Sequence, residues 1–284
     1  MPELPEVETI RLGLQKKIVG LKIKKVEVLS PKSFLGNPKK VQGKNILKIW
    51  RKAKILGIDL GNLSLLIHLK MTGQLIYDDG KRFIGGHPTQ DMVGPLPNKS
   101  TRVIFTFNNG SKLYFNDQRR FGWIRVIRGK GEGESGKLFD KLGPEPLEKE
   151  FTWEILKKNL LRHKSMPIKV ALLDQSVVSG IGNIYANEVC FNAGLDPRIR
   201  VGDLGDKEFK KLQKGVIRVI KEGIKHGGSS RAHFVDPEGH KGYFLDYAKV
   251  YWRDKKPCKA CGEIIQKFQL RGRGTYYCPS CQKG

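Results

Sequence analysis

The chain has 284 residues, enough for one large domain or two ordinary ones, and we expect two. Hydrophobic residues make up 39% and aromatic residues 9%, which suffices for packed cores and excludes a wholly disordered chain. The net charge of +25 predicts a polyanionic partner. The sequence contains neither an apolar run long enough to span a membrane nor an N-terminal signal segment, so we expect a cytoplasmic, nucleoid-associated protein.

The first predicted element is a helix from Pro5 to about Val19. Proline suits the first turn of a helix, Glu6 and Glu8 suit its positive end, and Gly20 suits a C-terminal stop. Apolar residues recur on one face of this segment: Val7, Ile10, Leu14 and Ile18.

After Gly20 the apolar period changes from about 3.6 to 2, which is typical of strands. Short β-branched segments are separated by Gly, Asn and Asp, and a loop rich in Gly and Pro, residues 78–98, interrupts them. We therefore predict two packed sheets. The strand-like segments are residues 21–29, 46–60, 64–71, 101–107, 112–115 and 123–127.

The pattern is helical from about residue 144, and the boundary between domains is expected near residues 135–150. The predicted fold class is α+β. The helical segments are residues 151–161, 167–175, 183–194 and 206–228. The predicted domains are 1–135, 150–228, a connector at 229–250 and a terminal domain at 251–284.

Four of the five cysteines form two CxxC pairs separated by 16 residues, a spacing typical of a four-thiolate zinc site. These are Cys258, Cys261, Cys278 and Cys281. The residues between the pairs alternate around Arg271 and Arg273, which predicts a β-hairpin with a basic turn. Four thiolates leave no open position for catalysis, so the zinc is either a structural clip alone or a support that presents the arginines to phosphate. Cys190 is expected to be a buried small hydrophobe.

Residues 180–188, GIGNIYANE, predict an anion-binding turn ahead of a helix. Gly180 and Gly182 would let successive N–H groups point at one place, and Asn183 lies where an N-cap residue belongs. The alternative is an ordinary connection between two helices. The strong positive charge of the chain favours a phosphate clamp.

Residues 117–123, DQRRFGW, lie between two predicted strands. Adjacent arginines followed by an aromatic residue and a glycine can present a guanidinium and a ring from a tight loop, and such a wedge can enter a base stack. The alternative is an exposed hairpin with a phenylalanine in the core.

The N-terminal residues offer a candidate nucleophile. Met1 precedes the small residue Pro2, so we expect Met1 to be removed, which leaves a secondary amine flanked by Glu3 and Glu6. An α-amino group titrates near pH ~8, so a useful fraction is unprotonated at neutral pH. The alternative is an ordinary helix start with proline in its first turn.

Together these features resemble the bacterial formamidopyrimidine-DNA glycosylase family along essentially the whole chain. The resemblance implies an N-terminal β-sandwich with a leading helix, a helix–two-turn–helix module around residues 166–192, and a zinc-finger hairpin. It also implies one structural zinc ion, a monomeric protein and damaged double-stranded DNA as the partner. The motifs are MPELPEVET, RKAKIL, HLKMTG, DQRRFG, LGPEPL, GIGNIYANE, GGSS followed by GYF, VYWR and GRGTYYCPSCQ.

The resemblance also implies roles for individual residues. Pro2 would attack C1′ of a flipped oxidised purine nucleotide and form a Schiff base, and Glu3 would protonate the sugar ring oxygen, with Glu6 supporting the site. Lys54 matches a lysine assigned to proton transfer in β-elimination and to phosphate contact. Arg273 matches an arginine linked to δ-elimination.

Further residues match DNA contacts of the family. Asn183, together with Arg273, would grip the phosphates around the lesion, and Lys164 matches a DNA-contacting lysine. Met71, Arg119 and Phe121 match the residues that fill the gap left by the flipped nucleotide.

The chain departs from the family at several positions. Gln118 replaces a proline, Ser100 aligns with an expected DNA-contacting histidine, and the 78–98 loop looks longer than usual. The residues around 229–242 belong to the family's variable base-recognition loop, so they do not fix the choice of lesion.

Two other functions compete with an oxidised-purine glycosylase. A non-catalytic basic zinc-ribbon protein would explain the charge and the CxxC pairs. It would not explain the simultaneous match of Pro2, Glu3, Glu6, Lys54 and Arg273. The endonuclease VIII branch of the same superfamily prefers oxidised pyrimidines. The opening ELPE and the set of Met71, Arg119 and Phe121 favour the purine branch.

Overall fold

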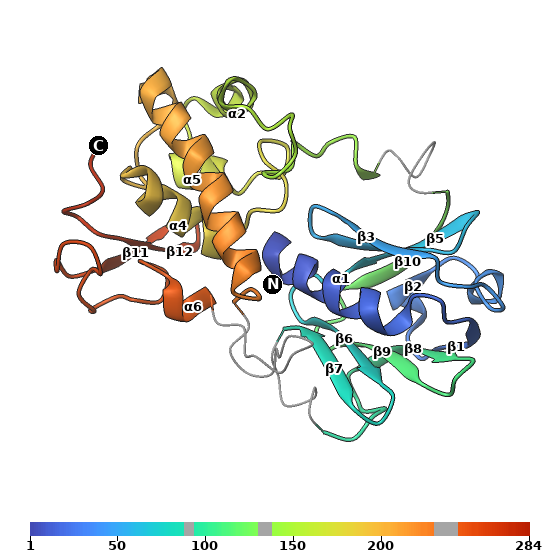
Figure 1. Ribbon diagram of the computed structural model, residues 1–284. Helices are drawn as coiled ribbons and strands as arrows, with labels where there is room; N and C mark the ends of the chain where they lie inside the picture. The colour runs from blue at the N-terminus through green and yellow to red at the C-terminus, as the bar shows by residue number, and fades with distance from the viewer. Residues whose placement is uncertain (88–93, 130–137, 230–243) are drawn as a thin grey trace. The chain divides into compact units, whose positions relative to one another are not determined.

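The computed structural model describes residues 1–87, 94–129, 138–229 and 244–284 (Figure 1). The chain divides into two compact units, Met1–Asp140 with the segment that begins at His226, and Lys141–Lys225 with Phe244–Gly284. Parts of the predicted loop at 78–98, of the boundary at 135–150 and most of the connector at 229–250 lie outside the described residues. The helices and strands confirm the α+β class.

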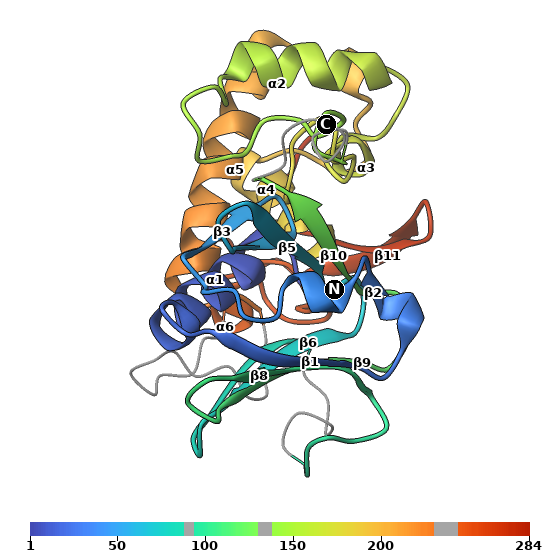
Figure 2. The same ribbon diagram turned by 90° about the vertical axis from the view of Figure 1, so that its right-hand side faces the viewer.

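The first unit is a sandwich of two five-stranded sheets, which form separate layers in Figures 1 and 2. One sheet has the order β1-β8-β9-β6-β7 and the other β2-β10-β5-β4-β3. Neighbouring strands are antiparallel, except for the parallel pair β10 and β2. The strands are β1 (Ile23–Val28), β2 (Phe34–Leu35), β3 (Lys48–Lys52), β4 (Ile55–Asp59), β5 (Leu63–His68), β6 (Gly73–Asp78), β7 (Arg82–Gly86), β8 (Thr101–Phe107), β9 (Lys112–Asp117) and β10 (Trp123–Arg128).

The core of the sandwich comes from the alternation seen in the sequence. Phe105 and Phe115 of one sheet and Leu65 and Ile67 of the other are buried in one apolar cluster. Side chains two residues apart in a strand point to the same face, so each strand contributes every second residue to this layer. Full burial of one such side chain stabilises the fold by roughly 1.5–3 kcal/mol.

The leading helix α1 (Leu4–Ile18) contacts β3 and β7, the terminal strands of the two sheets. It therefore covers one open side of the sandwich and protects two sheet edges. Its apolar face, Val7, Ile10, Leu14 and Ile18, belongs to the core cluster. The predicted helix and the observed helix differ by one residue at each end.

The predicted loop at 78–98 is wrong in part, because residues 82–86 form strand β7, which pairs with β6. The expected strands did not include β6 either. The signal was weak because Gly85 and Gly86 end β7, and glycine has little intrinsic preference for strands. Close packing explains them: a Cβ on Gly85 would lie 2.5 Å from Cγ1 of Ile10, and one on Gly86 would lie 2.4 Å from the carbonyl oxygen of Gly73.

The second unit contains the predicted helices. The second of them, predicted over 167–175, spans only four residues because a turn follows Ala171. The next helix ends at Ala193, and Gly194, whose φ is +71°, provides its left-handed cap. No helix in the described ranges is long and apolar enough to cross a bilayer. The helices are α2 (Trp153–Leu160), α3 (Ile168–Ala171), α4 (Asn183–Ala193), α5 (Asp206–Lys225) and α6 (Phe244–Tyr247).

The predicted hairpin near the C-terminus is formed by β11 (Gln266–Leu270) and β12 (Arg273–Tyr277). Its two-residue turn has positive φ at both positions, +48° at Arg271 and +71° at Gly272. Such a turn matches the twist of the flanking strands.

Candidate functional site

The start of α1 forms a compact group of buried polar side chains. Glu3 and Glu6 are 3% and 5% exposed, and Pro2 is buried between Met1 and this turn. Glu6 Oε2 accepts the backbone N–H of Glu3 at 2.8 Å, and Oε1 accepts the N–H of Ser229 at 2.7 Å. Glu6 therefore fixes the backbone at the beginning of the helix and the segment at Ser229.

Lys54 reaches the same group from the tip of the β3–β4 hairpin, and only 6% of it is exposed. The preceding residue, Ala53, has a left-handed φ of +51°. Arg51 donates from its guanidinium to the Ala53 carbonyl at 3.1 Å and from Nε to Glu8 of α1 at 3.0 Å. These bonds hold the tip against the helix and fix the direction of Lys54.

The electrostatics place the amino group, Lys54 and the two carboxyl groups in one environment. Burial lowers the pKa of the α-amino group at Met1, with Lys54 acting in the same direction and the carboxylates of Glu3 and Glu6 opposing it. Burial also lowers the pKa of Lys54, where the two carboxylates again oppose the shift. A depressed pKa makes an amine a better nucleophile or proton acceptor near neutral pH.

The loop at 117–123 is organised by Asp117, which is fully buried. Its Oδ1 accepts the hydroxyl of Thr72 and the N–H of Arg119 at 3.2 Å, and Oδ2 accepts the N–H of Gly122 at 2.6 Å. The hydroxyl oxygen of Thr72 also accepts the Arg119 N–H at 3.1 Å. One carboxylate thus ties this loop to the segment that carries Met71.

The predicted wedge residues are exposed around this carboxylate. Phe121 is 53% exposed and Met71 is 37% exposed. The guanidinium of Arg119 lies over the Phe121 ring, 4.8 Å from its centroid. Large apolar side chains held outside a core are available to a partner, so the alternative reading of this loop, with the phenylalanine in the core, is wrong. Gln118 is exposed beside them, and the intervening Arg120 has a φ of +58°.

The prediction that Asn183 is an N-cap is wrong, because Gly182 occupies that position and Asn183 is the first residue of α4. Its side chain turns instead to the hairpin: Nδ2 donates to the Gly274 carbonyl at 3.1 Å. Oδ1 accepts from Nζ of Lys169 at 2.6 Å. These bonds therefore fix the Asn183 side chain against Gly274, the residue that follows Arg273.

Lys169 is a residue that the sequence reasoning missed. It is fully buried in α3, and its Nζ also donates to Thr275 Oγ1 at 3.1 Å and to the Gly274 carbonyl at 3.3 Å. One ammonium thus joins α3, the start of α4 and strand β12. The signal was a lysine inside the apolar segment PIKVALL, where a charge needs buried partners.

The remaining predicted contact residues lie at different depths. Arg273 and Lys164 are exposed. Lys164 follows α2, and its carbonyl accepts the N–H of Gly202 at 2.9 Å. Ser100 is 2% exposed, and its carbonyl accepts the N–H of Asp117 at 2.8 Å, so its backbone supports the wedge loop.

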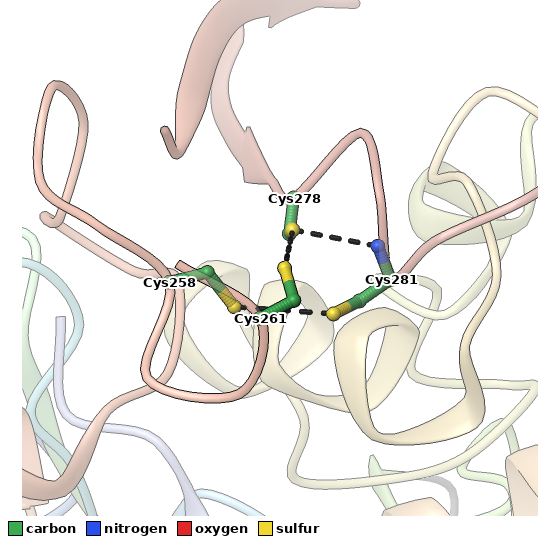
Figure 3. A group of neighbouring side chains, drawn as sticks. All are labelled: Cys258, Cys261, Cys278 and Cys281. Carbon is green, nitrogen blue, oxygen red and sulfur yellow. Dashed lines mark hydrogen bonds between the residues drawn. The ribbon is translucent and has the colours of Figure 1, made fainter. Parts of the chain in front are cut away.

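The four C-terminal cysteines converge, with all their sulfur atoms within 4.8 Å of one another (Figure 3). Sγ of Cys261 and Cys278 are 3.4 Å apart, and those of Cys258 and Cys281 are 3.9 Å apart. A tetrahedral zinc with bonds of about 2.3 Å separates its sulfur ligands by about 3.8 Å, so these cysteines are in position to hold one zinc ion. Cys190 takes no part: it is fully buried, and burial raises the pKa of its thiol to about 12.

Family models match three consecutive parts of the chain. They are the formamidopyrimidine-DNA glycosylase N-terminal domain over residues 1–124, the formamidopyrimidine-DNA glycosylase H2TH domain over 142–234, and a zinc finger found in FPG and IleRS over 255–284. The zinc-finger match includes all four converging cysteines.

Similar proteins cover the full chain. A formamidopyrimidine-DNA glycosylase of Pelotomaculum thermopropionicum is 41% identical over 100% of this chain and 99% of its own length, and one of Listeria monocytogenes is 38% identical over 100% of both. The crystal structure of MutM (Fpg) from Thermus thermophilus has a TM-score of 0.84 at 34% identity and covers 99% of this chain and 98% of that one. A Lactococcus lactis Fpg mutant in complex with Fapy-dG containing DNA has a TM-score of 0.86 at 33% identity, with both chains fully covered. The chain therefore belongs to the formamidopyrimidine-DNA glycosylase family.

Proposed function

We propose that this protein is a bifunctional DNA glycosylase and abasic-site lyase, which excises oxidised purines such as 8-oxoguanine and formamidopyrimidines from duplex DNA in base excision repair. The main support is that Pro2, the residue next to the N-terminus, is buried at the start of α1, where Glu3, Glu6 and Lys54 are buried as well. The complexes of Lactococcus lactis Fpg with Fapy-dG containing DNA and with abasic-site DNA support the substrate class. We propose that the protein acts as a monomer.

The nucleophile is the Pro2 nitrogen after removal of Met1, because in the unprocessed chain this nitrogen is an amide with a delocalised lone pair. The amine attacks C1′ of the flipped nucleotide, and the bond from C1′ to the base breaks with its electron pair on the base. The proton of the attacking amine passes to the departing base, which leaves the nitrogen with the lone pair that the next step needs. Glu3 protonates the ring oxygen, so the sugar opens and an iminium forms between C1′ and Pro2. Glu6 holds this backbone through Glu3 and Ser229.

The lyase reaction then cleaves the strand. The iminium acidifies the protons on C2′, and loss of one of them expels the 3′ phosphate in β-elimination. Lys54, fixed at its hairpin tip, takes part in proton transfer and contacts this phosphate. Arg273 assists δ-elimination, which expels the 5′ phosphate.

DNA binding combines cations with an apolar wedge. Asn183 and Arg273 grip the phosphates around the lesion, and Lys164 contacts the backbone as a point charge. Met71, Arg119 and Phe121 fill the gap left by the flipped nucleotide. The zinc ion, held by four thiolates, has a structural role, because it supports the hairpin that presents Arg273.

Borohydride trapping on a duplex with 8-oxoguanine opposite cytosine tests the proposal. The processed protein should form a covalent protein–DNA complex, and an undamaged duplex of the same sequence should form none. A protein that binds the damaged duplex but never traps it would support the non-catalytic zinc-ribbon alternative. Trapping on a 5-hydroxycytosine duplex in preference to 8-oxoguanine would favour the pyrimidine branch.

A further inference from the structure

Helix α5 carries a continuous row of cationic side chains. Six lysine and arginine residues follow one another at alternating intervals of four and three positions, which places them on one face of the helix. All six are exposed, and the first and last lie about 27 Å apart along the helix axis. We call this set the α5 cationic row. Its members are Lys207, Lys211, Lys214, Arg218, Lys221 and Lys225.

The row lies on the side of α5 that faces away from the core. The buried side chains of the helix include Phe209, Val216 and Ile220. With 3.6 residues per turn, the mean direction of the buried residues and that of the row differ by roughly 160° around the helix axis. The cations therefore take no part in the packing of α5, and their side chains are available to a partner.

Few acidic groups neutralise this row. Within the described parts of the chain, Arg218 is the only member with an ion pair, to Glu222 at 3.2 Å, and 67% of its side chain is exposed. Like charges three and four positions apart on a helix repel one another. Phosphate groups bound along the row would relieve this repulsion, which the protein alone leaves uncompensated.

Helix α4 separates α5 from the hairpin of β11 and β12. A Cβ on Gly215 of α5 would lie 3.5 Å from the Val189 carbonyl oxygen and 3.6 Å from Cβ of Asn192. The hairpin is hydrogen-bonded to Asn183 and Asn187 of the same helix. These two pairs of α4 positions are about 170° apart around its axis. In Figure 2, accordingly, α5 and β11 lie on opposite sides of this unit. The row is thus a surface apart from the proposed lesion contacts of the hairpin.

The surroundings of the row favour duplex DNA over other polyanions. A helix that binds a membrane surface inserts an apolar face, but the apolar face of α5 is buried in the core. Single-stranded nucleic acid stacks its bases on aromatic side chains, and Phe209, the one aromatic residue of α5, is buried. A duplex presents one phosphate charge per about 1.7 Å of its axis, so the row matches the backbone of about eight base pairs.

We propose that the α5 cationic row is a second DNA-binding surface, which holds an undamaged duplex by its phosphates while another duplex occupies the lesion site at Asn183 and Arg273. Contacts to phosphate carry no sequence information, so this surface accepts any duplex. The surface goes beyond the proposed repair chemistry and requires none of its steps. A protein with two such surfaces can bind a new DNA segment before it releases the previous one.

Sedimentation velocity tests the proposal on the full-length protein. The protein is mixed with one equivalent of a short abasic-site duplex and then titrated with a labelled undamaged duplex at about 50 mM salt. The row variant combines Lys211→Gln, Lys214→Gln, Arg218→Gln and Lys221→Gln. The charge-matched control changes four exposed lysines on separate elements of the first unit. It combines Lys24→Gln, Lys32→Gln, Lys48→Gln and Lys112→Gln.

We expect the parent and the control to form a complex of one protein with two duplexes. The row variant should bind the labelled duplex at least tenfold more weakly, and the salt slope of this second step should be shallower by about three to four units. All three proteins should nick the abasic-site duplex at equal rates, because α5 has no proposed part in the reaction. Equal nicking also shows that the row variant is folded.

A row variant that bound the second duplex as tightly as the parent would overturn the proposal, and so would a parent that never bound two duplexes. Phosphatidylglycerol vesicles or single-stranded RNA could instead bind the parent more tightly than the undamaged duplex does, and lose this binding in the row variant. That result would overturn the assignment to DNA. A parent without preference for the abasic-site duplex would count against the proposed function, and the row would then be tested on undamaged duplex alone.

Discussion

Buried ionisable side chains in this protein are held by specific hydrogen bonds. Glu188 of α4 is 3% exposed and accepts the backbone N–H groups of Lys249, Val250 and Tyr251 at 2.8–2.9 Å. These bonds oppose the effect of burial, which raises its pKa. Lys169 has three oxygen partners and Glu6 two backbone donors. Loss of one partner would leave a buried polar group unsatisfied, which costs about 1–3 kcal/mol or more.

Replacement of Glu3 by glutamine should separate the two proposed activities. The variant keeps the amine, so it should still trap and nick a preformed abasic site within about threefold of the parental rate, since no base must leave. It should lose excision of intact 8-oxoguanine by about 10² or more, because the glutamine amide is a poor acid. Single-turnover assays on both duplexes measure this, and equal losses on the two substrates would contradict the role of Glu3.

Replacement of Lys169 by methionine should weaken DNA binding, although Lys169 itself is buried and is not proposed to contact DNA. Nζ of Lys169 donates to Asn183, Gly274 and Thr275, so its removal frees the Asn183 side chain and loosens the start of β12. We expect a loss of at least tenfold in affinity for abasic-site DNA, measured by fluorescence anisotropy. Lys157→Met, at an exposed pair with Asp206, is the matched control and should bind as the parent does. Parental affinity in the Lys169 variant would show that these bonds do not position Asn183.

His68 should make folding stability depend on pH. Burial, helped by Lys70 and Lys54, lowers the pKa of His68 to about 3 from 6.5. Between these values the unfolded chain binds a proton that the folded chain does not, so the free energy of unfolding falls as the pH falls. From pH 7 to about 4.5 the parent should lose about 1–3 kcal/mol more than His68→Gln, measured by urea unfolding. Parallel pH profiles would place the imidazole in a more solvated environment than the structure does.

At the scale of elements, tight turns with left-handed residues place several proposed functional side chains. Ala53 precedes Lys54, Arg120 lies between Arg119 and Phe121, and Arg271 begins the turn before Arg273. Positive φ is uncommon outside glycine, so such residues persist only where the surrounding contacts hold them. For the first two, the holding groups are Arg51 and Asp117.

Removal of zinc should affect the terminal hairpin and leave the rest folded. The described apolar core around the cysteines is small, so metal binding supplies much of the local stability. After chelation we expect the far-ultraviolet circular dichroism to remain close to that of the holoprotein, while protease cleavage appears within residues 258–281 and DNA nicking falls at least tenfold. Elemental analysis should give one zinc per chain before treatment. A metal-free protein with full activity would contradict the proposed support of Arg273.

At the scale of the whole molecule, the sequence predicted most strands and helices, because their periods of 2 and 3.6 are set by local geometry. Prediction from the sequence failed where tertiary contacts determine the structure. Strand β7 forms because Gly85 and Gly86 fit against α1 and β6. Lys169 and the Asp117 hydrogen bonds join segments whose proximity no sequence period encodes. The candidate site residues could be predicted from the motifs that resemble the family. The hydrogen bonds that hold these residues could be seen only in the structure.

The charge of +25 should make DNA binding strongly dependent on salt. Each phosphate neutralised releases counterions, so log K should fall against log salt with a slope of roughly −0.9 per contact. Lys164→Ala should make this slope shallower by about one unit and weaken binding to damaged and undamaged duplexes alike, because an exposed lysine recognises phosphate and not the lesion.

Lys24→Ala, at an exposed position of β1 with no proposed contact, is the matched control and should keep the parental slope. DNA-binding titrations at salt concentrations from about 50 to 300 mM measure the slopes of both variants. An unchanged slope for Lys164→Ala would remove this residue from the contacts, whereas equal changes in both variants would show that the overall field of the protein, and not a local contact, governs the dependence.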